Sequence, residues 1–281
     1  MLSPEVVDQV RALAAAVAEA DHEYPLNEDA RFALTSTDDV EHHLEYTAAD
    51  QDRLVGYAQG NRRHGTAQLL VHPEHRRQGI GTGLLSTVAP LPVWAFGDLD
   101  AAHHFATASH LVEKRRLLIM QRPLDPPVEI DDPAIRPFDP STDTEAFLAL
   151  NAAAFAWHPE QAHFSRADLD ARLADDWFEP SGFLISTDAE GLTGFHWTKR
   201  HPDGRGEVYI LATHPRAQGQ GLGRRLLAAG LNHLAAGGSP TVHLYVEAAN
   251  SRAVELYDRA GFAVVHSDVL YGPPPEPSQE P

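Results

Sequence analysis

Two spacings of apolar residues alternate along the second half of the chain, and each predicts one type of element. Between Gly223 and Ala236, leucines and alanines recur at helical spacing and Gly237-Gly238 follows, which predicts a helix that ends there. Short runs of β-branched and aromatic residues predict strands instead. The further elements predicted in this way are strands over 194–199, 207–211, 242–246 and 262–265, a turn over 202–204, and a helix over 251–260.

Earlier parts of the chain show the same pattern. Strands are predicted over 54–58 and 67–71, and Thr142 with Glu145 predicts a capping box for a helix that runs to Ala154. The order helix, strands, helix, strand, helix, strand is typical of α+β domains. We therefore predict mixed, twisted sheets with helices on both faces.

A segment of the first half recurs in the second. Leu69 to Leu85 matches Leu211 to Leu227 at a constant offset of 142 residues, with a leucine, His-Pro, a glutamine, two glycines and Leu-Leu in register. Self-similarity of this kind predicts two copies of one structural unit.

Proline-rich stretches predict the domain boundaries. Between Arg122 and Pro133 the prolines are too dense for a helix or a sheet, which is typical of an extended linker. We predict a first domain over 1–122, a linker over 123–133, a second domain over 134–272 and a disordered tail over 273–281.

Each copy places a glycine-rich turn between a strand and a leucine-rich helix. The turns are Arg76-Arg77-Gln78-Gly79-Ile80-Gly81 and Gln218-Gly219-Gln220-Gly221-Leu222-Gly223. Glycine lets backbone N–H groups approach an anion, and the start of a helix adds unpaired N–H groups and a positive dipole end. No Gly-Lys-Ser/Thr follows, and the turn is not placed as in a dinucleotide-binding fold. Both turns are therefore predicted to cradle a pyrophosphate.

Charge and composition exclude several classes of function. Forty acidic against 22 basic residues give a formal net charge of −18, which argues against nucleic acid and anionic membranes as partners. No apolar run approaches the roughly 20 residues of a membrane span, and no basic leader is visible, so we expect a cytoplasmic protein. The chain has no cysteine, which excludes disulfides and thiolate chemistry.

Seventeen histidines raise the question of a metal site. Metalloenzyme spacing such as His-Glu-x-x-His is missing, so we expect surface histidines and no metal. The pairs considered are His42-His43, His72 with His75, and His103-His104.

The two glycine turns resemble the coenzyme A signature, Gln/Arg-x-x-Gly-x-Gly, of the GCN5-related N-acetyltransferases. The resemblance covers nearly the whole chain and implies two tandem acetyltransferase domains with acetyl-CoA as cosubstrate. Segments of the second half resemble one actinobacterial branch of that family. Its members acetylate the cysteinyl amine of cysteinyl-glucosaminyl-inositol, a small-molecule amine. The segments are 151–161, 177–180, 194–199, 206–209 and 244–247.

The resemblance also implies site residues. Acetyl-CoA contacts fall in the second copy on Leu211, Ala212, Thr213, Gln218, Gly219, Gln220, Gly221, Leu222, Gly223, Arg224, Asn250, Ser251, Arg252, Ala253, Val254 and Glu255. In the first copy they fall on Leu69, Leu70, Val71, Arg77, Gln78, Gly79, Ile80, Gly81 and Thr82. Substrate contacts fall on Glu28, Glu160, Lys199, Glu207 and Tyr245. His214 stands where the family often has aspartate, and we expect the backbone contacts to survive there with a changed local shape.

Acetyl transfer to an amine needs a proton acceptor, an oxyanion donor and a proton for the departing thiolate. An α-amino group titrates near 7.7–8.0, so a carboxylate that works through water suffices, and Glu207 is the candidate. A backbone N–H near Leu211 to Thr213 would polarise the thioester carbonyl. Tyr257 resembles the tyrosine that many acetyltransferases aim at the CoA sulfur as general acid.

The matching stretch of the first copy, Trp94 to Thr107, has no tyrosine, so we predict chemistry only in the second domain. Each candidate also has a structural interpretation: Glu207 as a solvated charge at a strand start, Tyr257 as a buried helix residue, Tyr245 as an inward strand aromatic.

Two other functions stay open at this point. A tandem acetyltransferase could act on another amine, such as an aminoglycoside or a protein N-terminus, and a non-catalytic acyl-CoA sensor could use both cradles for regulation. The repeat supplies a pair of domains within one chain, so we expect a monomer.

Overall fold

The computed structural model describes residues 2–35, 40–47, 53–124, 132–156 and 164–275. The chain divides into two compact units, residues 1–117 with 266–281, and residues 118–265. Strands β5 (Val112–Pro123) and β11 (Ala263–Gly272) each contribute residues to both units. None of the helices in these ranges is long and apolar enough to cross a membrane.

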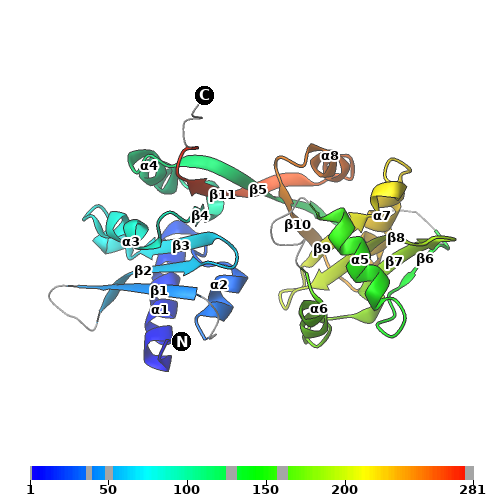
Figure 1. Ribbon diagram of the computed structural model, residues 1–281, viewed down its shortest axis with the longest axis horizontal. Coiled ribbons are helices and arrows are strands. Elements are labelled where there is room, and N and C mark those ends of the chain that lie inside the picture. Colours follow the sequence, from blue (N-terminus) through cyan, green and yellow to red (C-terminus); the bar gives the residue numbers. More distant parts are fainter. Residues whose placement is uncertain (1, 36–39, 48–52, 125–131, 157–163, 276–281) are drawn as a thin grey trace, which may run out of the picture. The chain divides into compact units, whose positions relative to one another are not determined.

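The first unit is a mixed sheet with helices on both faces (Figure 1). Its strands follow the order β1-β2-β3-β4-β11-β5. Its elements are α1 (Pro4–Asp21), α2 (Glu28–Ala33), β1 (Val40–Tyr46), β2 (Leu54–Asn61), β3 (Thr66–Val71), the 3-10 turn η1 (Pro73–His75), α3 (Ile80–Val88), β4 (Val93–Ala95), η2 (Phe96–Asp98) and α4 (Asp100–Ala108).

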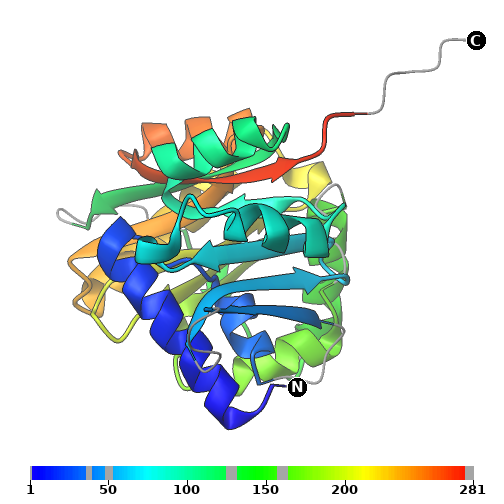
Figure 2. The same cartoon turned by 90° about the vertical axis from the view of Figure 1, so that its left-hand side faces the viewer.

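Alternating side chains of the first unit's strands pack on different helices. Tyr57 and Leu70 belong to a cluster with Val10 of α1, whereas Ala58 and Ala67 belong to a cluster with Leu84 of α3. Figure 2 shows α1 in dark blue and α3 in cyan beside these strands. Helices on both faces explain why β2 is buried at every residue except the last, Asn61.

The second unit repeats this plan with the strand order β5-β10-β9-β8-β7-β6. Its elements are β6 (Ile135–Pro137), α5 (Thr144–Ala154), α6 (Arg166–Leu173), η4 (Pro180–Gly182), β7 (Phe183–Asp188), β8 (Gly191–Arg200), β9 (Gly206–Thr213), η5 (Pro215–Ala217), α7 (Leu222–Ala236), β10 (Thr241–Glu247) and α8 (Ser251–Arg259).

Two cores hold the second unit together, one on each face of its sheet. On one face the fully buried ring of Trp197 stacks on Phe183 with centroids 4.3 Å apart, next to Phe147 of α5. On the other face Val208 and Leu244 pack with Leu231 of α7. Helices on both faces leave the ends of the strands as the open part of the unit.

The central strands of each unit pair in parallel only at their beginnings. In the second unit the β9–β10 ladder consists of Gly206 with Val242 and Glu207 with His243. A β-bulge follows at once in β9, since the consecutive β8 residues Thr198 and Trp197 lie opposite Val208 and Ile210, so that Tyr209 is the extra residue. A bulge bends the strand that carries it, which accounts for the separation of β9 from β10 beyond Glu207. In the first unit the β3–β4 ladder is the single pair Ala67 with Val93.

The predicted fold class is confirmed, since parallel and antiparallel pairs share one sheet in each unit. The predicted hairpin, helices and strands of the second half are present, and β11 continues to Gly272, seven residues beyond the predicted strand end at 265. The predicted capping box of Thr142 and Glu145 is wrong. Asp143 is the N-cap of α5, and its carboxylate accepts hydrogen bonds from Arg136 and the backbone of Asp139.

Asp268 on β11 makes the stability of the first unit depend on pH. Burial raises the pKa of its carboxyl to about 6, and the backbone N–H of Gly97 donates to it at 3.0 Å. Between about pH 4 and 6 the folded unit binds more protons than the unfolded chain, so stability falls as pH rises through that window. Asp268→Asn keeps an acceptor for Gly97, and we expect a gain of about 1–2 kcal/mol at pH 7.5 with none at pH 4.

Thermal unfolding of the variant and wild type at both pH values measures this effect. Asp8→Asn, at an exposed ion pair on α1, is the control and should change neither Tm. An equal gain for Asp268→Asn at pH 4 and pH 7.5 would show that the titration of Asp268 is not the cause.

Candidate active site

The glycine turn of the second unit forms a concave row of backbone amides. Gly219 and Gly221 have φ of 80° and 74°, in the left-handed region, and Gly221 is the N-cap of α7. No side chain caps the helix, so its first amides have no acceptor within it. Turns that contain left-handed residues can direct successive N–H groups toward one point, which is a site for phosphate oxygens.

Side chains join this turn to the start of α8. Arg252 in the first turn of α8 donates to Oε1 of Gln218 at 2.7 Å, and Asn250 caps the helix by accepting from the N–H of Ala253. The predicted acetyl-CoA residues of 218–224 and of 250–255 therefore meet at the turn. Arg225 was not among the predicted residues. It donates to Asp132 at 2.7 Å and to the carbonyl of Gln220 at 3.1 Å, and so it links the turn to Asp132.

The first unit repeats the turn in detail at the offset of 142 residues. Arg77 and Gly79 have φ of 61° and 87°, and Gly79 is the N-cap of α3. Gln78 donates to the carbonyl of Glu74 at 3.5 Å, as Gln220 does to that of Arg216 at 3.3 Å. A left-handed arginine costs about 1–3 kcal/mol, so its presence indicates that the rest of the turn enforces this shape.

A cavity of about 740 Å³ lies beside the first turn. Among the predicted residues, Gln78 and Ile80 are not part of its wall, whereas Leu69, Leu70, Val71, Arg77, Gly79, Gly81 and Thr82 line it. Trp94, Phe96, Phe105 and Tyr271 add aromatic surface. The volume is in the range of cofactor and drug-sized sites. Tyr271 comes from β11, so a tyrosine does reach this cavity although the stretch 94–107 has none.

One face of the second unit's sheet carries the predicted substrate residues. Glu207 lies opposite Lys199 in the β8–β9 ladder and beside His243 in the β9–β10 ladder. Residues two apart in a strand share a face, so Tyr245 lies on the same face as His243. Lys199 and Glu207 are buried, and Tyr245 is 51% exposed. This polar row crosses three strands at the point where β9 and β10 separate.

Glu207 lies beside two histidines and is hydrogen-bonded to one of them. Its Oε2 lies 2.7 Å from Nε2 of His201, in the turn after β8, and 3.9 Å from Nε2 of His243. Burial lowers the pKa of His243, and the nearby Glu207 offsets part of that change. The interpretation of Glu207 as a solvated charge is therefore wrong, because the carboxylate is buried and hydrogen-bonded.

Lys199 lies in an aromatic corner. Its Nζ is 4.6 Å from the ring centroid of Trp177 and 5.4 Å from that of Tyr209. The hydroxyl of Tyr209 in turn accepts from Nε of Arg172 at 2.7 Å. Rings that face an ammonium stabilise its charge where water is scarce.

Tyr257 lies within the apolar core on the α7 and α8 side of the sheet. Its ring contacts Phe262 with centroids 5.7 Å apart, and burial raises the pKa of its phenol above the ordinary value. A raised pKa keeps the phenol protonated at neutral pH but makes it a weaker acid. The observed surroundings of Tyr257 are those of a residue packed in the core.

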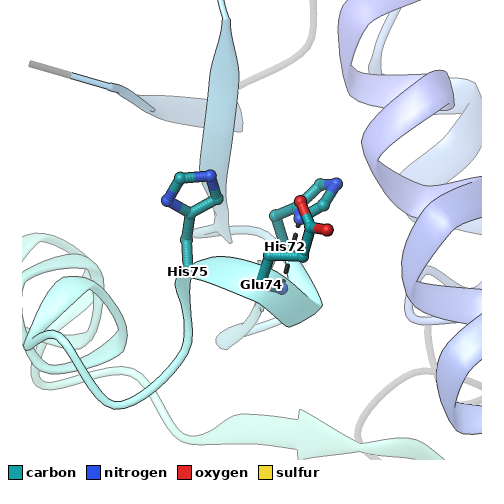
Figure 3. A group of neighbouring side chains, drawn as sticks. All are labelled: His72, Glu74 and His75. Carbon is teal, nitrogen blue, oxygen red and sulfur yellow. Dashed lines mark hydrogen bonds between the residues drawn. The ribbon is translucent and has the colours of Figure 1, made fainter. Parts of the chain in front are cut away.

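Two groups of side chains have the composition of a cation site, namely His201, Glu207 and His243, and His72, Glu74 and His75. Imidazole and carboxylate are ligands that zinc accepts. Figure 3 shows that Nδ1 of His72 accepts from the backbone N–H of Glu74 at 3.3 Å. His214 makes the same bond to the N–H of Arg216 at 3.2 Å, so this histidine caps a 3-10 turn in both units and has a structural role.

Two predicted substrate residues are not among the residues of this row. Glu28 belongs to the first unit, where it is exposed in the first turn of α2, and Glu160 lies outside the described residues. His201 and His243 were missed, because histidine alone is a weak signal and only the parallel register brings 243 beside 207. Strand alternation over 241–247 would have placed His243 and Tyr245 on one face.

Family models match both units. The model described as the acetyltransferase (GNAT) family matches residues 150–262, and that described as the acetyltransferase (GNAT) domain matches residues 41–114. GNAT acetyltransferases use acetyl-CoA as their cosubstrate.

Relatives match the chain along nearly its whole length. A protein of Streptomyces bingchenggensis named mycothiol acetyltransferase is 41% identical over 288 residues, covering 96% of this chain and 94% of its own. A protein of the same name from Kytococcus sedentarius is 42% identical over 287 residues, covering 97% of this chain and 96% of its own.

Solved structures share the fold at lower identity. A GCN5-related N-acetyltransferase from Sphaerobacter thermophilus has a TM-score of 0.72 at 22% identity and covers 96% of this chain and 93% of its own. A tandem GNAT protein from the clavulanic acid biosynthesis pathway has a TM-score of 0.67 at 18% identity. The match covers 95% of this chain and 94% of that protein.

Proposed function

The chain belongs to the mycothiol acetyltransferase family of tandem GNAT proteins, and from this premise we propose that its second unit transfers acetyl from acetyl-CoA to the cysteinyl amine of cysteinyl-glucosaminyl-inositol, giving mycothiol and CoA. Acetyl transfer in mycothiol biosynthesis is the activity of the family. The observation that carries the assignment to the second unit is Glu207, buried and hydrogen-bonded where β9 and β10 separate.

The residues of the second unit have separable tasks. The amides of the turn at Gly219 to Leu222 bind the pyrophosphate of acetyl-CoA, and Arg252 fixes the edge of that turn. Backbone N–H groups at the end of β9, around Leu211 to Thr213, face the space left by β10 and polarise the thioester carbonyl. Glu207 works on the amine side of the reaction, and Tyr257 returns a proton to the thiolate.

The first unit binds acetyl-CoA or CoA without catalysing transfer. Its turn and its cavity of about 740 Å³ support binding. At the offset of 142 residues the position of Glu207 is taken by Gly65, so no carboxylate stands at the start of β3. Since the repeat supplies two domains within one chain, we further propose that the protein works as a monomer, in the cytoplasm.

A competition assay tests the substrate. Acetyl-CoA and cysteinyl-glucosaminyl-inositol are incubated with the enzyme together with an aminoglycoside and a peptide with a free N-terminus, and mass spectrometry follows each amine. We expect kcat/KM for the cysteinyl compound to exceed that for the others by at least about 100-fold, since a site that hydrogen-bonds its substrate rejects analogues strongly. Preference for the aminoglycoside or the peptide would show that the enzyme acetylates that amine instead. Binding of acetyl-CoA without transfer to any amine would indicate a non-catalytic acyl-CoA sensor.

A further inference from the structure

Glu207 is not an isolated carboxylate. Nε2 of His201 lies 2.7 Å from its Oε2, Nε2 of His243 lies 3.9 Å from the same oxygen, and the two imidazole rings are 5.0 Å apart between centroids. These three side chains come from the β8–β9 turn, β9 and β10. Neither histidine has a role in the reaction so far.

A carboxylate beside one ring nitrogen selects the tautomer of an imidazole. When His201 carries its proton on Nε2 and donates to Glu207, the lone pair on Nδ1 is left to accept a proton. The ordinary pKa of an imidazole, about 6.5, is closer to that of an α-amine than the 4.3 of a glutamate. An acceptor matched in this way is more effective at neutral pH.

The structure distinguishes between the two histidines. The side chain of His201 is 25% exposed, so water reaches it, whereas that of His243 is 7% exposed. Burial lowers the pKa of His243, which keeps the ring neutral. His243 therefore fills the space behind Glu207 without adding charge.

We propose that the imidazole of His201 receives the proton released by the substrate amine and that Glu207 is the positioning residue that holds the ring. The proposal rests on the function proposed above. Water carries the proton from the amine nitrogen to Nδ1 of His201, and the nitrogen lone pair forms the C–N bond with the acetyl carbon. The C–S bond breaks with its electron pair on sulfur, the thiolate is protonated by Tyr257, and the resulting phenolate takes a proton back from solvent. The Glu207–His201 pair changes from a net charge of −1 to zero, and the imidazolium later releases its proton to solvent.

Other charged groups near His201 compensate one another. Asp203 and Arg205 lie in the same turn and are joined by a hydrogen bond of 2.8 Å, and Lys199 lies two residues earlier on β8 over the rings of Trp177 and Tyr209. From β10 the groups are His243, which is neutral, and Tyr245. Glu207 is the one carboxylate in hydrogen-bond contact with the ring among the described residues.

The variant His201→Gln keeps the hydrogen bond to Glu207 but removes the proposed proton acceptor. The glutamine amide can donate to the carboxylate, but it cannot be protonated near neutral pH. We expect kcat to fall about 100-fold, while KM for acetyl-CoA changes less than about 2-fold. The acidic limb of kcat against pH should be shallower than in the wild type, because only the substrate amine must then lose a proton. Free imidazole should restore part of the activity of His201→Ala. His233→Asn, a partly buried histidine beside Glu179, is the control and should keep the wild-type profile.

A second measurement does not depend on turnover. The ¹⁵N chemical shifts of the His201 ring should show the proton on Nε2 at pH 8 in the wild type and a mixture of tautomers in Glu207→Gln. A wild-type kcat profile in His201→Gln, or a ring protonated on Nδ1, would overturn the proposal. If the wild-type enzyme acetylates no cysteinyl amine, the proposed function fails instead, and the ring shifts still decide the role of Glu207 toward His201.

Discussion

Glu207→Gln is expected to lower kcat by about 100- to 1,000-fold with little change in KM for acetyl-CoA. The substitution keeps the shape of the side chain and an oxygen that can accept from His201, but it removes the negative charge that fixes the ring and balances the new imidazolium. Because the turn that binds the cofactor begins beyond the other end of β9, binding of acetyl-CoA should be preserved. Steady-state kinetics by mass spectrometry measures both quantities.

The matched control is Glu247→Gln, a second buried glutamate at the end of β10 with no assigned role in the reaction. It should reduce kcat by less than about 5-fold. The double variant Glu207→Gln with Tyr257→Phe removes the residue that positions the proton acceptor together with the proton donor of the second unit, so it should have no measurable turnover if chemistry runs only there. Turnover that persists in the double variant would mean that the first unit is catalytic or that other groups move the protons.

The second large effect is expected from a matched pair of glycine substitutions. Gly221 and Gly79 are the N-caps of α7 and α3, with φ of 74° and 87°, so valine is strained to a similar degree at both positions. Loss of two amide contacts to phosphate at about 1.5 kcal/mol each corresponds to a factor of more than 100. We therefore expect Gly221→Val to reduce kcat/KM for acetyl-CoA by at least about 50-fold more than Gly79→Val does.

Calorimetric titration with CoA completes this test. Each variant should lose one of the two binding sites of the wild type, and Tm values near that of the wild type would show that both variants fold. Equal losses of turnover in the two variants would contradict the division of labour between the units. A wild-type protein that binds a single CoA would leave the first cavity to another ligand.

The sequence predicted the two turns because their information is local. The glycines and flanking leucines lie within two 17-residue segments at a constant offset, and the left-handed conformations of Gly79, Gly219 and Gly221 follow from them. Arg77 was not expected to be left-handed, because arginine has no local preference for that region. The turn as a whole imposes it there.

What could not be predicted depends on contacts between distant residues. The pairing of Val269 with Ala95 on β4 extends β11 beyond 265, and no local pattern signals a partner 174 residues away. The parallel register that places His243 beside Glu207 is equally non-local, and so is the contact of Arg225 with Asp132. The capping box failed for a related reason, since the carboxylate of Asp143 is held by Arg136.

The central claim is that this enzyme acetylates the nitrogen of a cysteinyl group, and the position of the acetyl group in the product tests it most directly. Wild-type enzyme, acetyl-CoA and cysteinyl-glucosaminyl-inositol are mixed and quenched in acid at early times, which prevents acetyl migration from sulfur to nitrogen. The product is then treated with iodoacetamide and analysed by tandem mass spectrometry. We predict one acetyl group on the cysteinyl nitrogen and a thiol that is still alkylated. An acetyl group on sulfur, or no gain of acetyl with acetyl-CoA bound, would contradict the claim.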